Sequence, residues 1–389
     1  MEPRPSHNRS PDAEAQASGP APPAPPELSA LRARIDDLDA KIVALLNERA
    51  QVVSDVGRVK RDDGTPIYAP HREAAVLSKV LGQNAGPLPE RTLEAIYREL
   101  MSGSFAIEQP LRIGYLGPPG SFSHVAAMAH FGASVEFGDT GTIAGVFDEV
   151  RRGRADYGLA PIENSTGGSI AETLDAFKDG EDKVRVYAEA LVTIRHNLLS
   201  NCAAGTIKRV YSKPEIFLQC RKFLSAEMPE AQLIPSASSS RAAQEAFEAA
   251  QADPQCGAAA IGSSLAGRLY GLNTLYEDVE DNPNNITRFL IISRQEAEVS
   301  GKDKTSILFT TAHTPGSLVR VLQCFDRGGI NLAHIDKRPS GRENWKYSFY
   351  IEAEGHRSDP RMVDAIELAR RDCESLSVLG SYPAAQRIL

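Results

Sequence analysis

The stretch that decides the fold runs from Gly158 to Gly168 and reads Gly-Leu-Ala-Pro-Ile-Glu-Asn-Ser-Thr-Gly-Gly. Its short apolar run stops at Glu163, polar residues and two glycines follow, and a helical pattern begins near Ile170. In an open α/β sheet, ligands bind at the carboxyl ends of strands beside helix N-termini. The polar side chains and backbone N–H groups expected there suit a small anion. An ordinary strand-to-helix turn with a Ser or Thr cap gives the same pattern, so this stretch alone leaves both interpretations open.

Composition limits the class of protein. The chain has 389 residues, which exceeds one hydrophobic core and predicts two or three domains. Its 42% apolar and 24% charged residues are ordinary for a soluble globular protein, and its net charge of −8 argues against nucleic acid as the main partner. Five scattered cysteines without C-x-x-C spacing predict reduced thiols, with neither a disulfide framework nor a zinc site.

Targeting and membrane segments are not expected. No apolar run approaches the ~20 residues that span a bilayer, and the N-terminus lacks the apolar core of a secretory signal. Residues 1–26 hold eight prolines and no Leu, Ile, Val or Phe, so they cannot bury enough surface to fold and are predicted to be disordered. We therefore expect a cytoplasmic protein without a membrane partner, a metal or another cofactor.

A long helix is predicted from Leu28 to Val59, where apolar residues alternate at steps of three and four. This spacing gives a coiled-coil-like seam. Arg49 occupies a seam position, which is costly for a guanidinium unless it is paired. An ion pair with a neighbouring helix and a contact to a ligand both explain an arginine there.

The position of Lys60 favours the second explanation, a contact between Arg49 and a ligand. Lys60 lies eleven residues after Arg49, about 20° away around the helix and roughly 16 Å along it. Two long cationic side chains that lean together could hold the two carboxylates of one small dianion. Arg32 lies about 26 Å from Arg49 on another face, so only an antiparallel partner helix could bring it to the same ligand. A shared site therefore predicts a dimer.

Two further helices are predicted, from about Pro70 to Leu81 and from about Pro89 to Glu108. Three helices, the first of them ~50 Å long, make a poor monomeric core. This region, residues 27–109, resembles the all-α chorismate mutases fused to the front of bifunctional chorismate mutase/prephenate dehydratases, in which an intertwined dimer binds chorismate. The resemblance implies carboxylate contacts from Arg32 (supplied by the partner), Arg49, Lys60 and Arg72, a hydroxyl contact from Glu73, and further site positions at Ser104 and Glu108.

The mutase reaction needs few kinds of residue. It is a pericyclic rearrangement, so a site has only to hold the substrate in a chair and stabilise charge on the ether oxygen. Cations and one hydrogen-bond donor meet that need. Enteric members of the family carry Gln where this chain has Glu108 and Asp where it has Ala69. A glutamate donates a hydrogen bond only when protonated, so Glu108 should make the mutase sensitive to pH; the alternative is that Glu108 faces solvent.

A second domain opens at Leu111 as a strand, a glycine loop and a helix, in the sequence Leu-Arg-Ile-Gly-Tyr-Leu-Gly-Pro-Pro-Gly-Ser-Phe-Ser. The loop lacks the Gly-Lys-Ser/Thr ending of a phosphate-binding loop, which excludes that function. Strand and helix patterns then alternate as in two α/β lobes, and a strand at Ile286–Ile292 is expected to return to the first lobe. Residues 110–298 resemble prephenate dehydratases, whose two-lobed, periplasmic-binding-protein-like fold holds its site in the cleft.

The signature of those dehydratases is formed by Thr287-Arg288-Phe289 together with Glu163-Asn164-Ser165. The resemblance implies that Thr287 contacts the leaving hydroxyl and that Arg288 orients a substrate carboxylate or the loop. Because an unaided Thr hydroxyl is a weak acid, a relay through Glu163 or water is expected to assist it. The other substrate contacts implied are Glu163, Asn164, Ser165, Thr166 and Phe289.

Residues 303–386 predict a third unit with the element order βαββαβ, which is typical of a ferredoxin-like α+β fold. It resembles the ACT regulatory domain appended to these dehydratases, and two segments resemble its phenylalanine-binding motifs, with substitutions. The residues implied are Gly316, Ser317, Leu318, Asp336, Arg338 and Pro339. A domain that only forms dimers is the alternative.

Together these resemblances identify the chain as a member of a family of bifunctional enzymes. Such an enzyme rearranges chorismate to prephenate, then dehydrates and decarboxylates prephenate to phenylpyruvate. We expect a homodimer or a higher homo-oligomer that phenylalanine inhibits. An arogenate dehydratase, whose substrate differs only by an amino group on the side chain, is one alternative. A non-catalytic amino-acid sensor is another, although a sensor needs neither the basic helical site nor the Thr-Arg-Phe segment.

Overall fold

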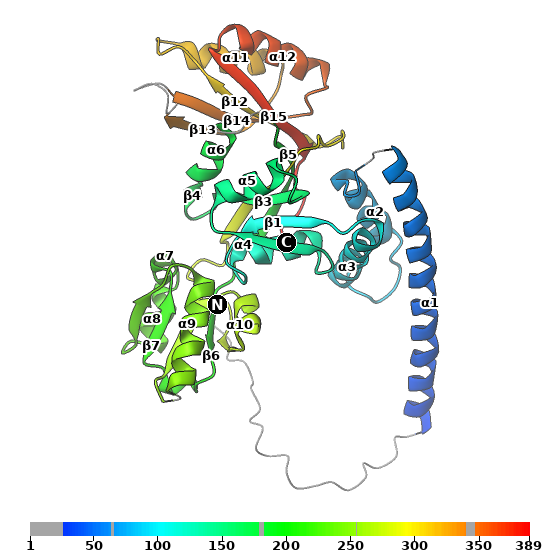
Figure 1. The fold of residues 1–389 in the computed structure, drawn as a ribbon, viewed down its shortest axis with the longest axis vertical. Helices are drawn as coiled ribbons and strands as arrows, with labels where there is room; N and C mark the ends of the chain where they lie inside the picture. The colour runs from blue at the N-terminus through cyan, green and yellow to red at the C-terminus, as the bar shows by residue number, and fades with distance from the viewer. Residues whose placement is uncertain (1–25, 64–65, 179–182, 254, 340–346) are drawn as a thin grey trace.

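The computed structural model describes residues 26–63, 66–178, 183–253, 255–339 and 347–389. Figure 1 shows a helical region along one side, two α/β lobes beside it, and a third sheet at one end of the long axis. The segment predicted to be disordered, residues 1–26, lies outside the described residues except for Pro26. In the described part of the chain, no helix is long and apolar enough to cross a membrane.

The helical region consists of α1 (Pro26–Asp63), α2 (Pro70–Gly82) and α3 (Glu90–Glu108). These helices match the three that the sequence predicts. α1 stands apart from the rest of the molecule along much of its length (Figure 1), and every residue from 27 to 48 is exposed. Partial burial begins at Arg49, where α1 starts to pack on α3.

The first lobe is a six-stranded mixed sheet with the order β2-β1-β3-β11-β5, and β4 pairs with β3 beside it. β1 is parallel to β2 and β3, whereas β11 runs antiparallel to both of its neighbours. The return of β11 to this lobe confirms the prediction for Ile286–Ile292. The strands are β1 (Arg112–Leu116), β2 (Glu136–Thr140), β3 (Tyr157–Asn164), β4 (Gly168–Ser169), β5 (Arg185–Thr193) and β11 (Ile286–Ser293), and the helices that pack on them are α4 (Phe122–Phe131), α5 (Ile143–Arg151) and α6 (Ala171–Lys178).

The second lobe is inserted between β5 and β11. Its sheet has the order β10-β6-β9-β7-β8, with α7 to α10 connecting the strands. The chain crosses between the lobes twice, once before β6 and once after β10. The strands are β6 (Asn197–Ser200), β7 (Arg209–Ser212), β8 (Gln232–Pro235), β9 (Ala258–Gly262) and β10 (Asn273–Tyr276), and the helices are α7 (Pro214–Gln219), α8 (Arg221–Glu227), α9 (Ser239–Ala252) and α10 (Ser264–Tyr270).

The third unit has the predicted βαββαβ order, and its antiparallel sheet is arranged β13-β14-β12-β15. One face of the sheet packs on the two helices through a core that includes Ile307 and Phe309. The other face meets the first lobe, whose core includes Tyr350 and Tyr382 from this sheet. The elements are β12 (Asp303–Thr310), α11 (Ser317–Arg327), β13 (Leu332–Pro339), β14 (Tyr347–Glu354), α12 (Pro360–Arg371) and β15 (Ser375–Pro383).

The last residues of the chain return to the first lobe. The backbone N–H of Leu389 donates to the carbonyl of Leu191 at 2.8 Å, and the N–H of Thr193 donates to the carbonyl of Leu389 at 3.0 Å. The C-terminal segment thus lies along the edge strand β5. This placement covers an edge that would otherwise be open to pairing with another chain.

Two candidate active sites

The first candidate site lies where α1 packs on α3. Arg49 Nη1 donates to Ser104 Oγ at 2.7 Å, and Lys60 Nζ donates to Glu108 Oε2 at 2.9 Å. The helices come close at Gly57, because a Cβ built there would lie 3.0 Å from the Cα of Glu108. The structure therefore brings together four residues that the sequence places in one site.

Glu108 is buried, with 7% of its surface exposed. This burial contradicts the alternative that Glu108 faces solvent at the helix end. Lys60 also donates to the backbone carbonyl of Ile67 at 3.0 Å, so its ammonium group is held between the carboxylate and the chain that leads into α2. The resulting arrangement presents Arg49 and Lys60 as two cations on one side of α1, as a dianion would require.

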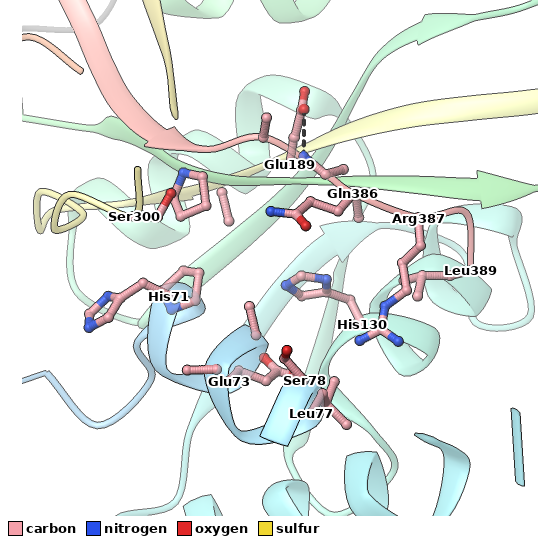
Figure 2. Close-up of a pocket in the computed structure, with 18 of the residues that line it drawn as sticks. His71, Glu73, Leu77, Ser78, His130, Glu189, Ser300, Gln386, Arg387 and Leu389 are labelled. Atoms are coloured by element: carbon pink, nitrogen blue, oxygen red, sulfur yellow. Dashed lines mark hydrogen bonds between the residues drawn. The ribbon is translucent and has the colours of Figure 1, made fainter. Parts of the chain in front are cut away.

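Three other predicted mutase residues lie outside this cluster. Arg32 and Arg72 are exposed. Glu73 on α2 faces a different space, a cavity of about 560 Å³ between α2, β5 and the C-terminal segment. Figure 2 shows Glu73 beneath His130 of α4 and Arg387 of the C-terminal segment. Within the described chain, no hydrogen bond or ion pair connects Glu73 with the four residues of the first candidate site.

Glu73 and His130, which both line this cavity, have strongly shifted pKa values. Burial raises the pKa of Glu73 to about 7, although Arg98 and Arg387 oppose the shift. Burial lowers the pKa of His130 to about 3, and its Nε2 is 2.7 Å from the hydroxyl of Tyr68. Both groups are therefore uncharged in slightly acidic solution, and Glu73 acquires its charge near neutral pH.

The second candidate site lies at the end of β3, where Asn164 pairs with Thr287 of β11. Asn164 Nδ2 donates to Thr287 Oγ1 and to Asn285 Oδ1, each at 2.8 Å. Asn164 Oδ1 accepts from the backbone N–H groups of Thr166 and Gly167, at 2.9 and 2.8 Å. Because backbone N–H groups can only donate, the orientation of the Asn164 amide is fixed.

This orientation determines what Thr287 can do. Its oxygen accepts a hydrogen bond from Asn164, so its own O–H is left to donate to another group. Accepted and donated hydrogen bonds polarise one another, which makes the hydroxyl a better donor than an isolated threonine. Thr287 is 8% exposed. Among the described residues, Asn164 is the side chain that contacts Thr287 Oγ1, and a relay through Glu163 or water stays a prediction.

The turn after β3 is held by Ser165. Its Oγ donates to the carbonyl of Asn284 at 3.1 Å and accepts from the N–H of Ile286 at 2.9 Å. Ser165 therefore fastens the end of β3 to the start of β11, while Thr166 is exposed beside it. Both Ser165 and Thr166 are exposed in this turn.

Arg288 points into a cluster of acidic residues. Its guanidinium lies 2.7 Å from Glu352 of β14 and 3.2 Å from both Glu189 and Glu163. Lys304 of β12 also binds Glu189, at 2.8 Å. Burial lowers the pKa of Arg288, but Glu352 together with Tyr350 and Tyr382 outweighs burial, and the net pKa is raised. Arg288 therefore forms its ion pairs with residues of neighbouring strands. The sequence did not predict Glu189 and Glu352 as its partners, because both lie far from Arg288 in the chain.

Phe289 requires a correction. It was expected to contact substrate, but only 1% of its surface is exposed and it belongs to the core of the first lobe. The register of β11 shifts between Arg288 and Phe289, and the Phe289 ring enters the core formed with β3 and β5. An aromatic residue on a central strand packs rather than binds a ligand in this position.

The glycine loop after β1 closes against the second lobe. The hydroxyl of Ser263 donates to the carbonyl of Gly120 at 2.7 Å, and that of Ser240 donates to the carbonyl of Pro119. Phe122, just after this loop, packs on the core of the second lobe. The loop therefore joins the two lobes.

The predicted phenylalanine-binding residues lie in two parts of the third unit. Gly316 caps α11 with a φ of +80°, and Ser317 is buried with its Oγ 2.7 Å from Thr314 Oγ1. On β13, Arg338 donates to Asp175 of α6 at 2.6 Å, and the carbonyl of Pro339 accepts from Lys178 at 2.6 Å. The strand with the second motif thus contacts the helix that follows the Asn164 turn. Leu318 is partly buried against the helix core and Asp336 is partly exposed.

Comparison with known proteins matches both the helical region and the two-lobed region of the chain. Residues 113–297 match the family model described as prephenate dehydratase, and residues 31–109 match that of chorismate mutase type II. The bifunctional chorismate mutase/prephenate dehydratase of Stutzerimonas stutzeri is 40% identical over 366 residues, covering 92% of this chain and 98% of that protein. The chain belongs to the bifunctional chorismate mutase/prephenate dehydratases.

Other relatives agree. The corresponding enzyme of Pseudomonas aeruginosa is 39% identical over 366 residues, covering 92% of this chain and 98% of that protein. A solved prephenate dehydratase from Arthrobacter aurescens, in complex with L-Phe, superimposes with a TM-score of 0.64 at 33% identity, covering 70% of this chain and 90% of that one. The protein is therefore an enzyme of phenylalanine biosynthesis, which excludes the non-catalytic sensor.

Proposed function

We propose that the enzyme performs its two reactions at two separate sites in separate domains. Residues 27–109 would form the chorismate mutase domain, and residues 110–298 a dehydratase domain of the two-lobed, periplasmic-binding-protein-like type. The two candidate sites support this division, because one is built from α1 and α3 and the other from β3 and β11.

In the mutase site, Arg49 and Lys60 hold the carboxylates of chorismate. Ser104 orients Arg49, since its hydroxyl accepts from the guanidinium and donates to the carbonyl of Leu100 at 2.8 Å. When Glu108 is protonated, it donates a hydrogen bond to the ether oxygen of chorismate. Lys60 stabilises the negative charge that develops on that oxygen. Arg72 and Glu73 would join the substrate only through a rearrangement of α2, since neither reaches the cluster here.

The mutase site is completed by a second subunit. The exposed Leu, Ile and Val residues along α1 between Leu31 and Val59 have 39% to 64% of their surface exposed, and they form a stripe too long to leave in water. An antiparallel α1 from another copy would cover the stripe and carry its Arg32 to the Arg49 cluster, about 26 Å along the helix. The proposed unit is therefore a homodimer, or a higher oligomer built from it.

In the dehydratase site, Thr287 donates its proton to the leaving hydroxyl of prephenate. Loss of that hydroxyl and of carbon dioxide creates an aromatic ring, so the enzyme has mainly to assist departure and orient the carboxylate. The observation that carries this proposal is the fixed amide of Asn164, which makes Thr287 a donor. Arg288 contributes by holding β11 in place through its carboxylates.

The third unit acts as an ACT domain that binds phenylalanine, in residues 303–386. The fold order supports this assignment, and so does the L-Phe complex of the Arthrobacter aurescens relative. The contacts from β13 to α6 and from Glu352 to Arg288 give the domain two connections to the dehydratase site. Phenylalanine would inhibit by favouring a less active arrangement of the lobes.

The test is Thr287→Ala in the full-length enzyme. Dehydratase activity should fall by at least ~100-fold, on the scale of a lost proton donor, while mutase activity stays near normal. Thr287→Ser keeps the hydroxyl and is the matched control. Equal loss of both activities would contradict the two-site proposal, and comparing prephenate with arogenate as substrates decides between the two dehydratase activities.

A further inference from the structure

A line of hydrogen-bonded side chains leads from Thr287 toward the crossovers between the lobes. Beyond Asn164, Asn285 Nδ2 donates to Gln219 Oε1 at 3.4 Å. The same oxygen lies 2.9 Å from Nε2 of His196. His196 precedes β6 on one crossover, Asn285 precedes β11 on the other, and Gln219 ends α7 in the second lobe. The line therefore connects the dehydratase site to both crossovers and to the second lobe.

The direction of every hydrogen bond in this line is determined. The carbonyl oxygen of Gln219 can only accept, so Nε2 of His196 must carry the proton. Burial lowers the pKa of His196 and keeps the imidazole neutral at neutral pH. Its Nδ1 is buried and has no hydrogen-bond partner among the described residues. His196 is thus fixed as a donor toward Gln219.

His196 is held by two backbone hydrogen bonds and by one contact to its ring. The backbone N–H of His196 donates to Glu280 Oε2 at 2.9 Å, and its carbonyl accepts from the N–H of Val279 at 2.8 Å. The ring of Phe122 packs edge-on against it, with the ring centroids 5.0 Å apart. Phe122 follows the glycine loop, so the position of His196 depends on the closed arrangement of the lobes.

We propose that His196 is a positioning residue of the dehydratase reaction, acting through Gln219, Asn285 and Asn164 on Thr287. With 1% of its surface exposed, His196 touches no substrate. It anchors one end of this series of hydrogen-bonded side chains, and Asn164 at the other end orients the Thr287 hydroxyl. The proposal rests on the proposed role of Thr287, and it makes that hydroxyl responsive to the relative position of the two lobes.

The first experiment compares His196→Phe with His196→Gln. Phenylalanine keeps the ring against Phe122 but cannot donate, whereas the glutamine amide retains a donor near the position of Nε2. His196→Phe should lower dehydratase kcat about 10-fold with little change in KM, on the scale of one lost hydrogen bond. His196→Gln should keep most of the activity. Equal activity of the two variants, or an effect confined to KM, would overturn the proposal.

The second experiment tests whether His196 acts through Thr287. In a Thr287→Ala background the line has no hydroxyl to direct, so adding His196→Phe should reduce the residual dehydratase activity no further. Additive losses would indicate a general structural role and refute the proposal. If Thr287→Ala alone retains activity, the failure belongs to the assignment of Thr287 instead.

Mutase activity of each variant reports whether the chain has folded. Should His196→Phe fail to fold, Asn285→Asp provides the second variant, because it keeps the oxygen that accepts from Asn164 but removes the donor to Gln219. It should lower kcat as His196→Phe is expected to do, and unchanged kcat would equally refute the proposal.

Discussion

At the scale of single residues, Glu73 and His130 give one cavity two opposite responses to pH. The folded-state pKa of Glu73, about 7, lies above its ordinary value of 4.5, so the folded chain keeps a proton that the unfolded chain releases. Its contribution to stability is complete below pH ~4.5 and is lost as the pH rises through about 7. His130, with a folded pKa of about 3, makes a contribution that is lost as the pH falls below ~6.5.

Glu73→Gln should therefore raise the melting temperature at pH 8 and leave it unchanged near pH 4.5. The reason is that glutamine never acquires the buried charge, which costs about 1.4 kcal/mol for each pH unit between the two pKa values. Thermal unfolding at several pH values measures this difference. Glu90→Gln, an exposed carboxyl at the start of α3, is the control. If the melting temperatures of Glu73→Gln and the unmodified enzyme differ by the same amount at every pH, ionisation of Glu73 does not reduce the free energy of unfolding.

At the scale of elements, the approach of α1 to α3 depends on Gly57. Its position between Arg49 and Lys60 sets how closely the cations meet Ser104 and Glu108. An added methyl group would meet the backbone of Glu108 at 3.0 Å, which a side-chain rotation cannot relieve. Relieving this contact would require a shift of one helix. The distance between α1 and α3 in the mutase site therefore depends on the absence of a side chain at Gly57.

Gly57→Ala should lower mutase kcat/KM about 10-fold or more, since small displacements of positioned groups have large effects on rate. Alanine favours a helix over glycine by ~1 kcal/mol, so helical content should not fall. Gly103→Ala on α3, where nothing lies within 4 Å, is the matched control and should remain active. Normal mutase activity in Gly57→Ala would mean that the helices are not held at this distance in the working enzyme.

The sequence predicted the helices and strands better than it predicted any other feature. The spacing of apolar residues predicted α1, and alternating strand and helix patterns predicted the two lobes and the βαββαβ unit. Side-chain orientation was harder to predict. Glu73 faces another cavity because the rotation of α2 depends on packing, and Phe289 is buried because β11 is a central strand. Asn285 could have been found, since it stands two residues before Thr287, whereas nothing local connects Arg288 with Glu352.

At the scale of the whole molecule, the proposed dimer makes a prediction about mixtures. Arg32→Ala and Arg49→Ala should each lack mutase activity, because every site would lose one arginine. Mixing the two should restore some activity after subunit exchange, since a heterodimer has one intact site. Arg34→Ala, which changes an exposed arginine of α1 outside the proposed site, is the control. Demonstrated heterodimers without recovered activity would count against a shared site.

The contact between the third unit and Arg288 makes another prediction. Glu352→Gln keeps the shape of the side chain but removes the charge that faces Arg288 at 2.7 Å. Phenylalanine should still bind, as calorimetry would detect, but the concentration that inhibits the dehydratase should rise about 10-fold. Glu354→Gln, on the exposed end of the same strand, is the control. Unchanged inhibition would remove this contact from the regulatory connection.

The central position of β11 also determines the order in which the two lobes can fold during translation. β3 and β5 leave the ribosome long before Ile286–Ser293, the strand that joins them, so the first lobe cannot close its sheet while the second lobe is being made. The second lobe has all its strands by Tyr276 and can fold first, as domains do during translation. Chains that stop before residue 286 expose the edges of β3 and β5, which invites aggregation. The strand that completes the sheet also carries Thr287, so an unfinished chain has no dehydratase site.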